Sequence, residues 1–227
     1  MARRRRLLPF VLLGLALVLA AGGATVYWAV HRVPEFYVRA LAHRPAEERQ
    51  ASEAVVRKTT ALASDLRKKS HSWQAVFTAD QINGWLAVDL PENHPHVLPP
   101  SIHDPRVDIQ PRLFTVAAKY DGALGSTVLS LEIDLFLPAD PPDTIAIRIK
   151  KLRAGSLPIG MNKIIDAVAR AAKESDWILQ WRQLNGDPVA YLTRPPDPDD
   201  PTASMHIDKI ELRAGEVFLS GHTGDAK

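Results

Sequence analysis

The chain has 227 residues, of which 46% are hydrophobic, and it carries no cysteine and a formal net charge of +2. This length suits one globular domain with an appendage. The lack of cysteine excludes a disulfide framework and a lipid-modified cysteine anchor. Four of the 28 basic residues are Arg3 to Arg6, so 24 remain against 26 acidic residues. Because these 24 form no basic stripe, nucleic-acid binding is not expected.

The appendage is an N-terminal apolar segment. Arg3 to Arg6 precede an uncharged run from Leu7 to Val30. At about 1.5 Å per residue, this run is long enough to cross a hydrocarbon core of roughly 30 Å. Residues 1–33 are therefore predicted to be a cytoplasmic arginine cap and a transmembrane anchor, with the rest periplasmic, outside the inner membrane. A cleaved signal peptide is the alternative, but Tyr27 and Trp28, placed for an outer aromatic belt, favour an uncleaved anchor.

Residues 34–70 are predicted to form a helical stalk that packs on the domain. Helices are expected from Pro34 to His43 and from Pro45 to Ser70, with a break at Arg44-Pro45. Pro45 suits the first helical position, and three basic residues follow in the expected last turn: Arg67, Lys68 and Lys69. One modest apolar stripe is formed by Ala51, Val55, Leu62 and Leu66.

The stretch FTADQINGWLA, residues 77–87, carries complete signals for a helix start. Thr78 is the expected N-cap, and Gln81 completes a capping box. The spacing of Ile82, Trp85 and Leu86 predicts that this face of the helix is buried. Gly84 in the interior indicates that another backbone passes close by. Trp85 either fills the core or lines a groove, and the pattern leaves both open.

After a proline-rich loop at 91–105, the hydrophobic period changes from that of a helix to two. Apolar residues alternate with polar ones such as Arg106, Thr115 and Glu132. The alternating apolar positions are Val107, Ile109, Phe114, Val116, Ala118, Tyr120, Leu129, Leu131, Ile133, Leu135, Leu137, Ile145, Ile147 and Ile149. This pattern predicts half-buried strands of an antiparallel sheet.

The C-terminal third contains a second helix and two hairpins. Met161, Ile164, Ile165, Val168 and Ala172 define the amphipathic helix. The pair Asn185-Gly186 predicts a tight hairpin turn. A last hairpin is predicted for the stretch MHIDKIELRAGEVFLSG. LRAG occurs at 152–155 and again at 212–215, where Gly155 and Gly215 can each supply a positive φ. Residues 71–227 are thus predicted to be one α+β domain, a curved antiparallel sheet packed on one or two amphipathic helices.

Two short motifs resemble motifs of bacterial single-pass envelope proteins of the YpmS type. The first is F-T-x-x-Q-I-N, which precedes the sheet, and the second is R-A-G-x-L-P-I, which ends a strand before the second helix. More distantly the order of elements is similar to AsmA-like and tubular lipid-binding (TULIP) domains. This resemblance covers most of residues 75–220. It implies lipid or membrane-associated binding outside the cytoplasm, and it supplies no catalytic residue.

The sequence thus favours a non-enzymatic, membrane-anchored protein that binds lipid or another apolar ligand near the membrane, with no cofactor. The candidate groove residues are Ile82, Trp85, Leu86, Leu131, Ile133, Ile147 and Ile165. Each of them could equally close on its neighbours as ordinary core. The alternative is a scaffolding protein of the cell envelope that holds a protein partner, and a hydrolase is a third possibility.

No metal site and no catalytic constellation is expected. His94, His96, His103 and Asp104 form the only metal-like cluster, and their spacing lacks a zinc signature, which favours an exposed loop. Asp197, Asp199 and Asp200 lack the glycine and glutamate of an EF-hand and are expected to be a solvated charge run. A hydrolase would most plausibly gather titratable groups around the three histidines.

Overall fold

Two antiparallel sheets and six helices make up the described part of the chain, which in this computed structural model comprises residues 8–68, 71–122, 125–141, 143–174, 177–193 and 205–224. The class is α+β, and the large antiparallel sheet predicted from the period-two pattern is confirmed. The expected aspartate-rich run at Asp197, Asp199 and Asp200 lies outside the described residues.

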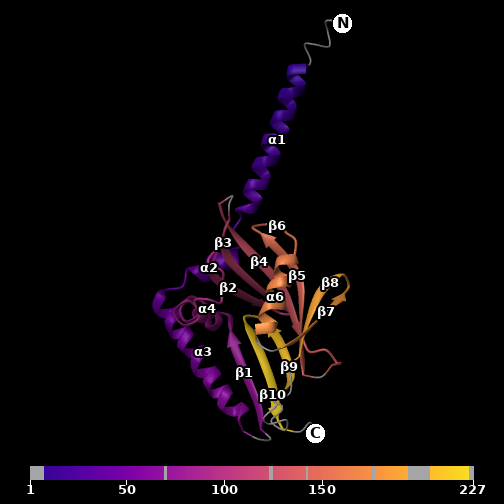
Figure 1. Cartoon of the computed structure of the whole chain (residues 1–227). Coiled ribbons are helices and arrows are strands. Elements are labelled where there is room, and N and C mark those ends of the chain that lie inside the picture. The colour runs from indigo at the N-terminus through magenta and orange to yellow at the C-terminus, as the bar shows by residue number, and fades with distance from the viewer. Residues whose placement is uncertain are drawn as a thin grey trace.

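The first helix, α1 (Leu8–Val30), projects away from the rest of the chain (Figure 1). Its side chains are described from Leu17 onward, and Leu17, Val18 and Leu19 are 63, 68 and 66% exposed. Among the helices that the structure describes, none is both long enough and apolar enough to cross a membrane. The membrane-spanning role of Leu7 to Val30 therefore remains a prediction.

Helices α2 (Glu35–Leu41) and α3 (Pro45–Leu66) are separated at Arg44, as expected from the proline. Helix α3 is shorter than predicted: Arg67 is its C-cap and Lys68 lies beyond it, so these two residues do not occupy its last turn. Lys69 and Ser70 lie outside the described residues. The Lys68 carbonyl accepts a hydrogen bond from the Thr223 hydroxyl, which draws the chain toward the sheet instead of continuing the helix.

The smaller sheet contains a strand that the sequence analysis did not predict. Its order is β1–β10–β9, where β1 spans Ser72–Thr78, β10 Glu216–Thr223 and β9 Met205–Arg213. The predicted C-terminal hairpin is therefore confirmed, with β1 added along β10. The alternation of Trp73, Ala75 and Phe77 is the signal that could have revealed β1.

The large sheet has the spatial order β2–β3–β4–β5–β8–β7, with the short β6 beside β5. The strands are β2 (Ile102–Gln110), β3 (Leu113–Gly122), β4 (Gly125–Phe136), β5 (Thr144–Ala154), β6 (Leu157–Pro158), β7 (Ile178–Leu184) and β8 (Asp187–Thr193). Asn185 and Gly186 both have positive φ, 54° and 87°, which confirms the tight turn between β7 and β8. The second amphipathic helix, α6 (Asn162–Glu174), packs against β7.

The proline-rich loop is shorter than expected, because α5 (Asp89–Asn93) occupies its start and β2 begins at Ile102. Helix α4 (Ala79–Ala87) begins as predicted. The Thr78 hydroxyl accepts from the Gln81 backbone N–H at 3.2 Å, and the Gln81 side chain accepts from the Thr78 backbone N–H at 3.2 Å. This is the expected capping box.

The buried face of α4 is a different one from that predicted. Ile82, Trp85 and Leu86 are only half-buried, whereas Asn83 is 3% exposed and Gly84 is buried. The Asn83 side chain donates to the Val107 carbonyl at 3.0 Å and accepts from the Val107 N–H at 2.7 Å. Since β2 is the edge of the sheet, this single amide pairs edge groups that would otherwise be buried without partners.

Asn83 on α4 reaches β2 while α3 packs on the other side of α4, and Gly84 makes this close packing of the two helices possible. A Cβ at this position would lie 2.5 Å from the Glu48 carbonyl oxygen and 2.6 Å from the Ala51 Cβ. The close backbone approach predicted from Gly84 is thus confirmed, and the neighbouring element is α3.

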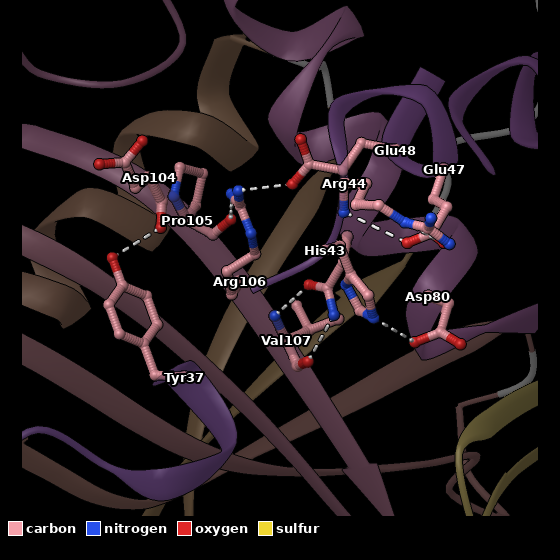
Figure 2. A network of polar contacts seen from close by, with 11 residues as sticks. Tyr37, His43, Arg44, Glu47, Glu48, Asp80, Asp104, Pro105, Arg106 and Val107 are labelled. Atoms are coloured by element: carbon pink, nitrogen blue, oxygen red, sulfur yellow. Dashed lines mark hydrogen bonds and ion pairs between the residues drawn. The ribbon is translucent and has the colours of Figure 1, made fainter. Parts of the chain in front are cut away.

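A buried ion pair joins α3 to the same strand (Figure 2). Arg106, predicted on the polar side of β2, is only 5% exposed, and its Nη2 lies 3.0 Å from the Glu48 Oε1. A charge this deeply buried requires such a partner. Beside it the Tyr37 hydroxyl donates to the Asp104 carbonyl at 2.9 Å, and burial raises the pKa of Tyr37 above its ordinary value. Helices α2, α3 and α4 are therefore each bonded to β2 through a side chain.

We expect Asn83→Ala to lower the free energy of unfolding by about 2 to 4 kcal/mol, because two buried backbone groups of Val107 lose their partners. Asn93→Ala is the matched control, since Asn93 is exposed and its amide donates to the Asp89 carboxylate on α5. The check is urea unfolding of both variants. A loss for Asn83→Ala no larger than for Asn93→Ala would show that the edge pairing does not matter.

Candidate functional site

One face of the large sheet is apolar across several strands. On β4 it presents Leu129, Leu131, Ile133 and Leu135, opposite Ala118, Val116 and Phe114 on β3. On β5 the partners of the same face are Leu152, Ile149 and Ile147. We call this surface the apolar face. Strand β4 has strands on both sides, yet its four apolar side chains are all only half-buried.

The apolar face is closed at one end by the smaller sheet. Ile109, Leu212 and Val217 form a buried cluster there, and Phe114 and Leu135 pack against it. Away from this cluster, Val116, Ala118, Leu129 and Leu131 stay half-buried. Tight packing would leave such side chains in the middle of a sheet nearly inaccessible. The remaining exposure is thus a feature of the β3–β4 part of this face, since Leu152 and Ile149 on β5 are buried.

The opposite face of the same strands is better closed. Tyr37 on α2 packs with Ala117 and Val128. Tyr37 is 2% exposed, Ala117 1% and Val128 6%. Ala117 lies between the alternating apolar positions Val116 and Ala118, so the period-two pattern places it with Thr115 on the polar side of β3. Its burial follows from α2 covering this face, which the period-two alternation does not reveal.

The structure brings together four of the seven predicted groove residues. Leu131 and Ile133 lie on β4, and Ile147 lies opposite Leu135 on β5. Ile82 packs against the cluster that closes the end of this face. Ile165 is half-buried on α6, which lies against β7.

Trp85 and Leu86 lie elsewhere. Leu86 lines a cavity of about 310 Å³ beneath the proline-rich loop, together with His94, His103 and Arg106. The Trp85 ring is half-buried, and its centroid lies 5.8 Å from that of His94. Trp85 is therefore neither a fully buried core residue nor part of the apolar face.

The loop histidines do not converge on one point. His94 and His96 are exposed, as predicted. His94 lies 3.7 Å from Asp89, whereas His103 lies 3.2 Å from Asp121 on another strand. Over the described ranges no group of three His, Cys, Asp or Glu side chains could hold a metal ion.

A polar cavity of about 520 Å³ lies on the opposite face, between the segment after α1 and β4. It is lined by Arg32, Arg39, Arg153 and Glu132 among others. Glu132 lies 3.6 Å from Arg153 and 3.7 Å from Lys151, so its charge is balanced. Glu35 and Asp108 also line the cavity, and this mixture of charges favours neither an anion nor a cation.

The sequence analysis missed the pocket at the end of α1. A cavity of about 570 Å³ with mostly apolar walls lies between α1 and the adjoining ends of β3 and β4. Figure 1 shows these two strands reaching the base of α1. Tyr120 and Thr127, which pair across the hairpin, form its floor opposite Val26 and Tyr27. Tyr120 belonged to the predicted alternation, but no local signal links it to α1.

The end of α1 is fastened to the sheet by its last carbonyl groups. The Ala29 carbonyl accepts from the Ser156 backbone N–H at 2.8 Å and from its hydroxyl at 3.0 Å, and the Val30 carbonyl accepts from the Thr127 hydroxyl. Gly155 has φ of +59°, as its predicted turn requires, and a Cβ there would collide with the Ala29 and Val30 carbonyls. Gly155, the last residue of the first LRAG, is thus required for two reasons. It adopts a positive φ, and its lack of a side chain leaves room for the end of α1.

Comparison of the chain with known protein families, curated proteins and solved structures found no match. The resemblance to YpmS-type and TULIP-like proteins has no support from these comparisons and stays a prediction.

Two glycine variants separate the joint with α1 from simple backbone strain. Gly155→Ala and Gly215→Ala both place a side chain at positive φ, +59° and +80°, but only Gly155 faces another segment, because nothing lies within 4 Å of a Cβ at Gly215. We expect the strain to cost each variant about 1 to 2 kcal/mol. Overpacking costs Gly155→Ala about 1 to 3 kcal/mol more.

Denaturant unfolding of the full chain measures this difference, and trypsin cleavage after Arg32 should accelerate only in Gly155→Ala. Equal losses and equal cleavage rates would mean that α1 is not held at this joint.

Proposed function

We propose that this chain is a single-pass, membrane-anchored periplasmic protein that binds lipid or another apolar ligand beside the inner membrane, without enzymatic activity. The observation that carries the proposal is the incomplete closure of the apolar face at Leu129 and Leu131, in the middle of the large sheet. A ligand covering this face would remove the remaining apolar surface from water, at roughly 25 cal/mol per Å².

The proposed anchor draws support from the length and exposure of α1. Its 23 residues extend about 35 Å, against roughly 30 Å of hydrocarbon. Val26, Tyr27 and Trp28 are 54, 61 and 78% exposed, so the domain leaves more than half of each residue accessible. In the proposed orientation, Arg3 to Arg6 stay in the cytoplasm and residues 34–227 face the periplasm.

A scaffolding role is the second candidate, and it draws on the edge strand β7. Within the described residues, β7 pairs with β8 on one side only. Ile178 and Leu184 on this strand are 50 and 40% exposed. An unpaired edge with apolar side chains is a common docking surface for another strand.

Lipid analysis of the full chain purified from membranes in mild detergent tests the leading proposal. We expect native mass spectrometry to find a bound lipid, and Leu131→Asp to reduce it at least tenfold, or about 1.4 kcal/mol. The physical reason is the cost of placing a carboxylate against an acyl chain. Leu184→Asp is the matched control, because it makes the same change on the exposed edge strand.

Circular dichroism shows whether both variants fold. A lipid-free wild-type protein that also binds no added phospholipid would contradict the proposal. If Leu184→Asp instead abolished capture of a co-purifying protein, scaffolding would be the better account.

A further inference from the structure

The pocket at the base of α1 and the apolar face of the sheet lie along the same face of the β3–β4 hairpin. Tyr120 pairs with Thr127 at the pocket, and the next pairs along the hairpin on the same face are Ala118–Leu129, Val116–Leu131 and Phe114–Ile133. We call these last three pairs the hairpin stripe. Every one of its six side chains is half-buried.

The stripe runs from α1 to the smaller sheet. Phe114, at its far end, packs against the buried cluster of Ile109, Leu212 and Val217. From Tyr120 to Phe114 the strand rises about 20 Å, at about 3.4 Å per residue. One leaflet of a bilayer contributes about 15 Å of hydrocarbon, half of roughly 30 Å. The pocket residue Tyr120 and the hairpin stripe together are therefore long enough for a whole acyl chain from one leaflet.

The walls of the pocket come from α1 itself. Gly23, Val26, Tyr27 and Val30 line one side, and all four belong to the predicted membrane run. Nothing lies within 4 Å of a Cβ placed at Gly23, so this wall is open. The bonds from Ser156 and Thr127 to the last carbonyls of α1 hold the helix beside the hairpin tip.

We propose that the pocket between α1 and the β3–β4 hairpin admits one acyl chain of a phospholipid from the outer leaflet of the membrane that α1 is proposed to cross, and that this chain lies along the hairpin stripe. This inference rests on the proposed function and names its ligand and its route. The ligand is a phospholipid because the pocket opens beside the residues predicted to stand in the bilayer, where phospholipid is the abundant apolar molecule. Each buried CH₂ contributes about 0.8 kcal/mol.

The test is photo-cross-linking of the full chain in vesicles of phosphatidylethanolamine and phosphatidylglycerol that contain a phospholipid with a diazirine at the end of one acyl chain. Peptide mapping by mass spectrometry locates the cross-links. In the wild type we expect them on the hairpin stripe, including the peptides of Phe114 and Ile133 at its far end.

Ala118→Trp should block the stripe one pair beyond the pocket and reduce cross-links at Phe114 and Ile133 at least tenfold. Lys119→Trp is the matched control, since the same residue is introduced one position along, on the opposite face of β3 at a position that is itself exposed. Leu129→Trp, the cross-strand partner of Ala118, gives an independent block if Ala118→Trp unfolds.

Loss in either blocking variant with retention in Lys119→Trp supports the route. Full far-end cross-linking in a folded blocking variant would overturn the route while leaving lipid binding intact. No cross-links on the apolar face of the wild type would overturn the route and the proposed function together.

Discussion

The rest of the structure depends on one side-chain amide, that of Asn83. Its two hydrogen bonds to Val107 close the edge of the large sheet, and they also fix α4 against that edge. Because Gly84 lets α3 lie directly behind α4, the helices and the sheet become one packed unit. The Arg106–Glu48 pair adds a direct link between β2 and α3. With β2 fixed in this way, the β3–β4 hairpin beside it has a defined position relative to α1.

This arrangement stabilises the sheet without closing its apolar face. Tyr37 covers the opposite face through Ala117 and Val128, and the smaller sheet covers one end through Leu212 and Val217. The side chains in the middle of the hairpin thereby keep part of their apolar surface accessible. A ligand that bound here would bury this apolar surface, and we regard that burial as the physical basis of the proposed binding.

Local signals predicted the elements, whereas contacts distant in sequence decided their roles. The capping box of Thr78 and Gln81 and the turn at Asn185-Gly186 each depend on residues no more than three positions apart. Both predictions were confirmed. Asn83 and Arg106 are buried through partners 24 and 58 residues away, which no periodicity reports. The same limit applies to the candidate site: Leu131 and Ile133 could be placed on one face, but Trp85 could not be excluded from it. The pocket between Tyr120 and α1 required the fold itself.

The most direct test of a ligand on the apolar face is an experimental structure of the full chain purified from membranes with its lipids retained. Our account predicts an elongated density along Ala118, Leu129 and Leu131, continuous with the pocket at the base of α1. A structure in which these side chains are fully covered by the protein's own residues, with no additional density, would contradict it.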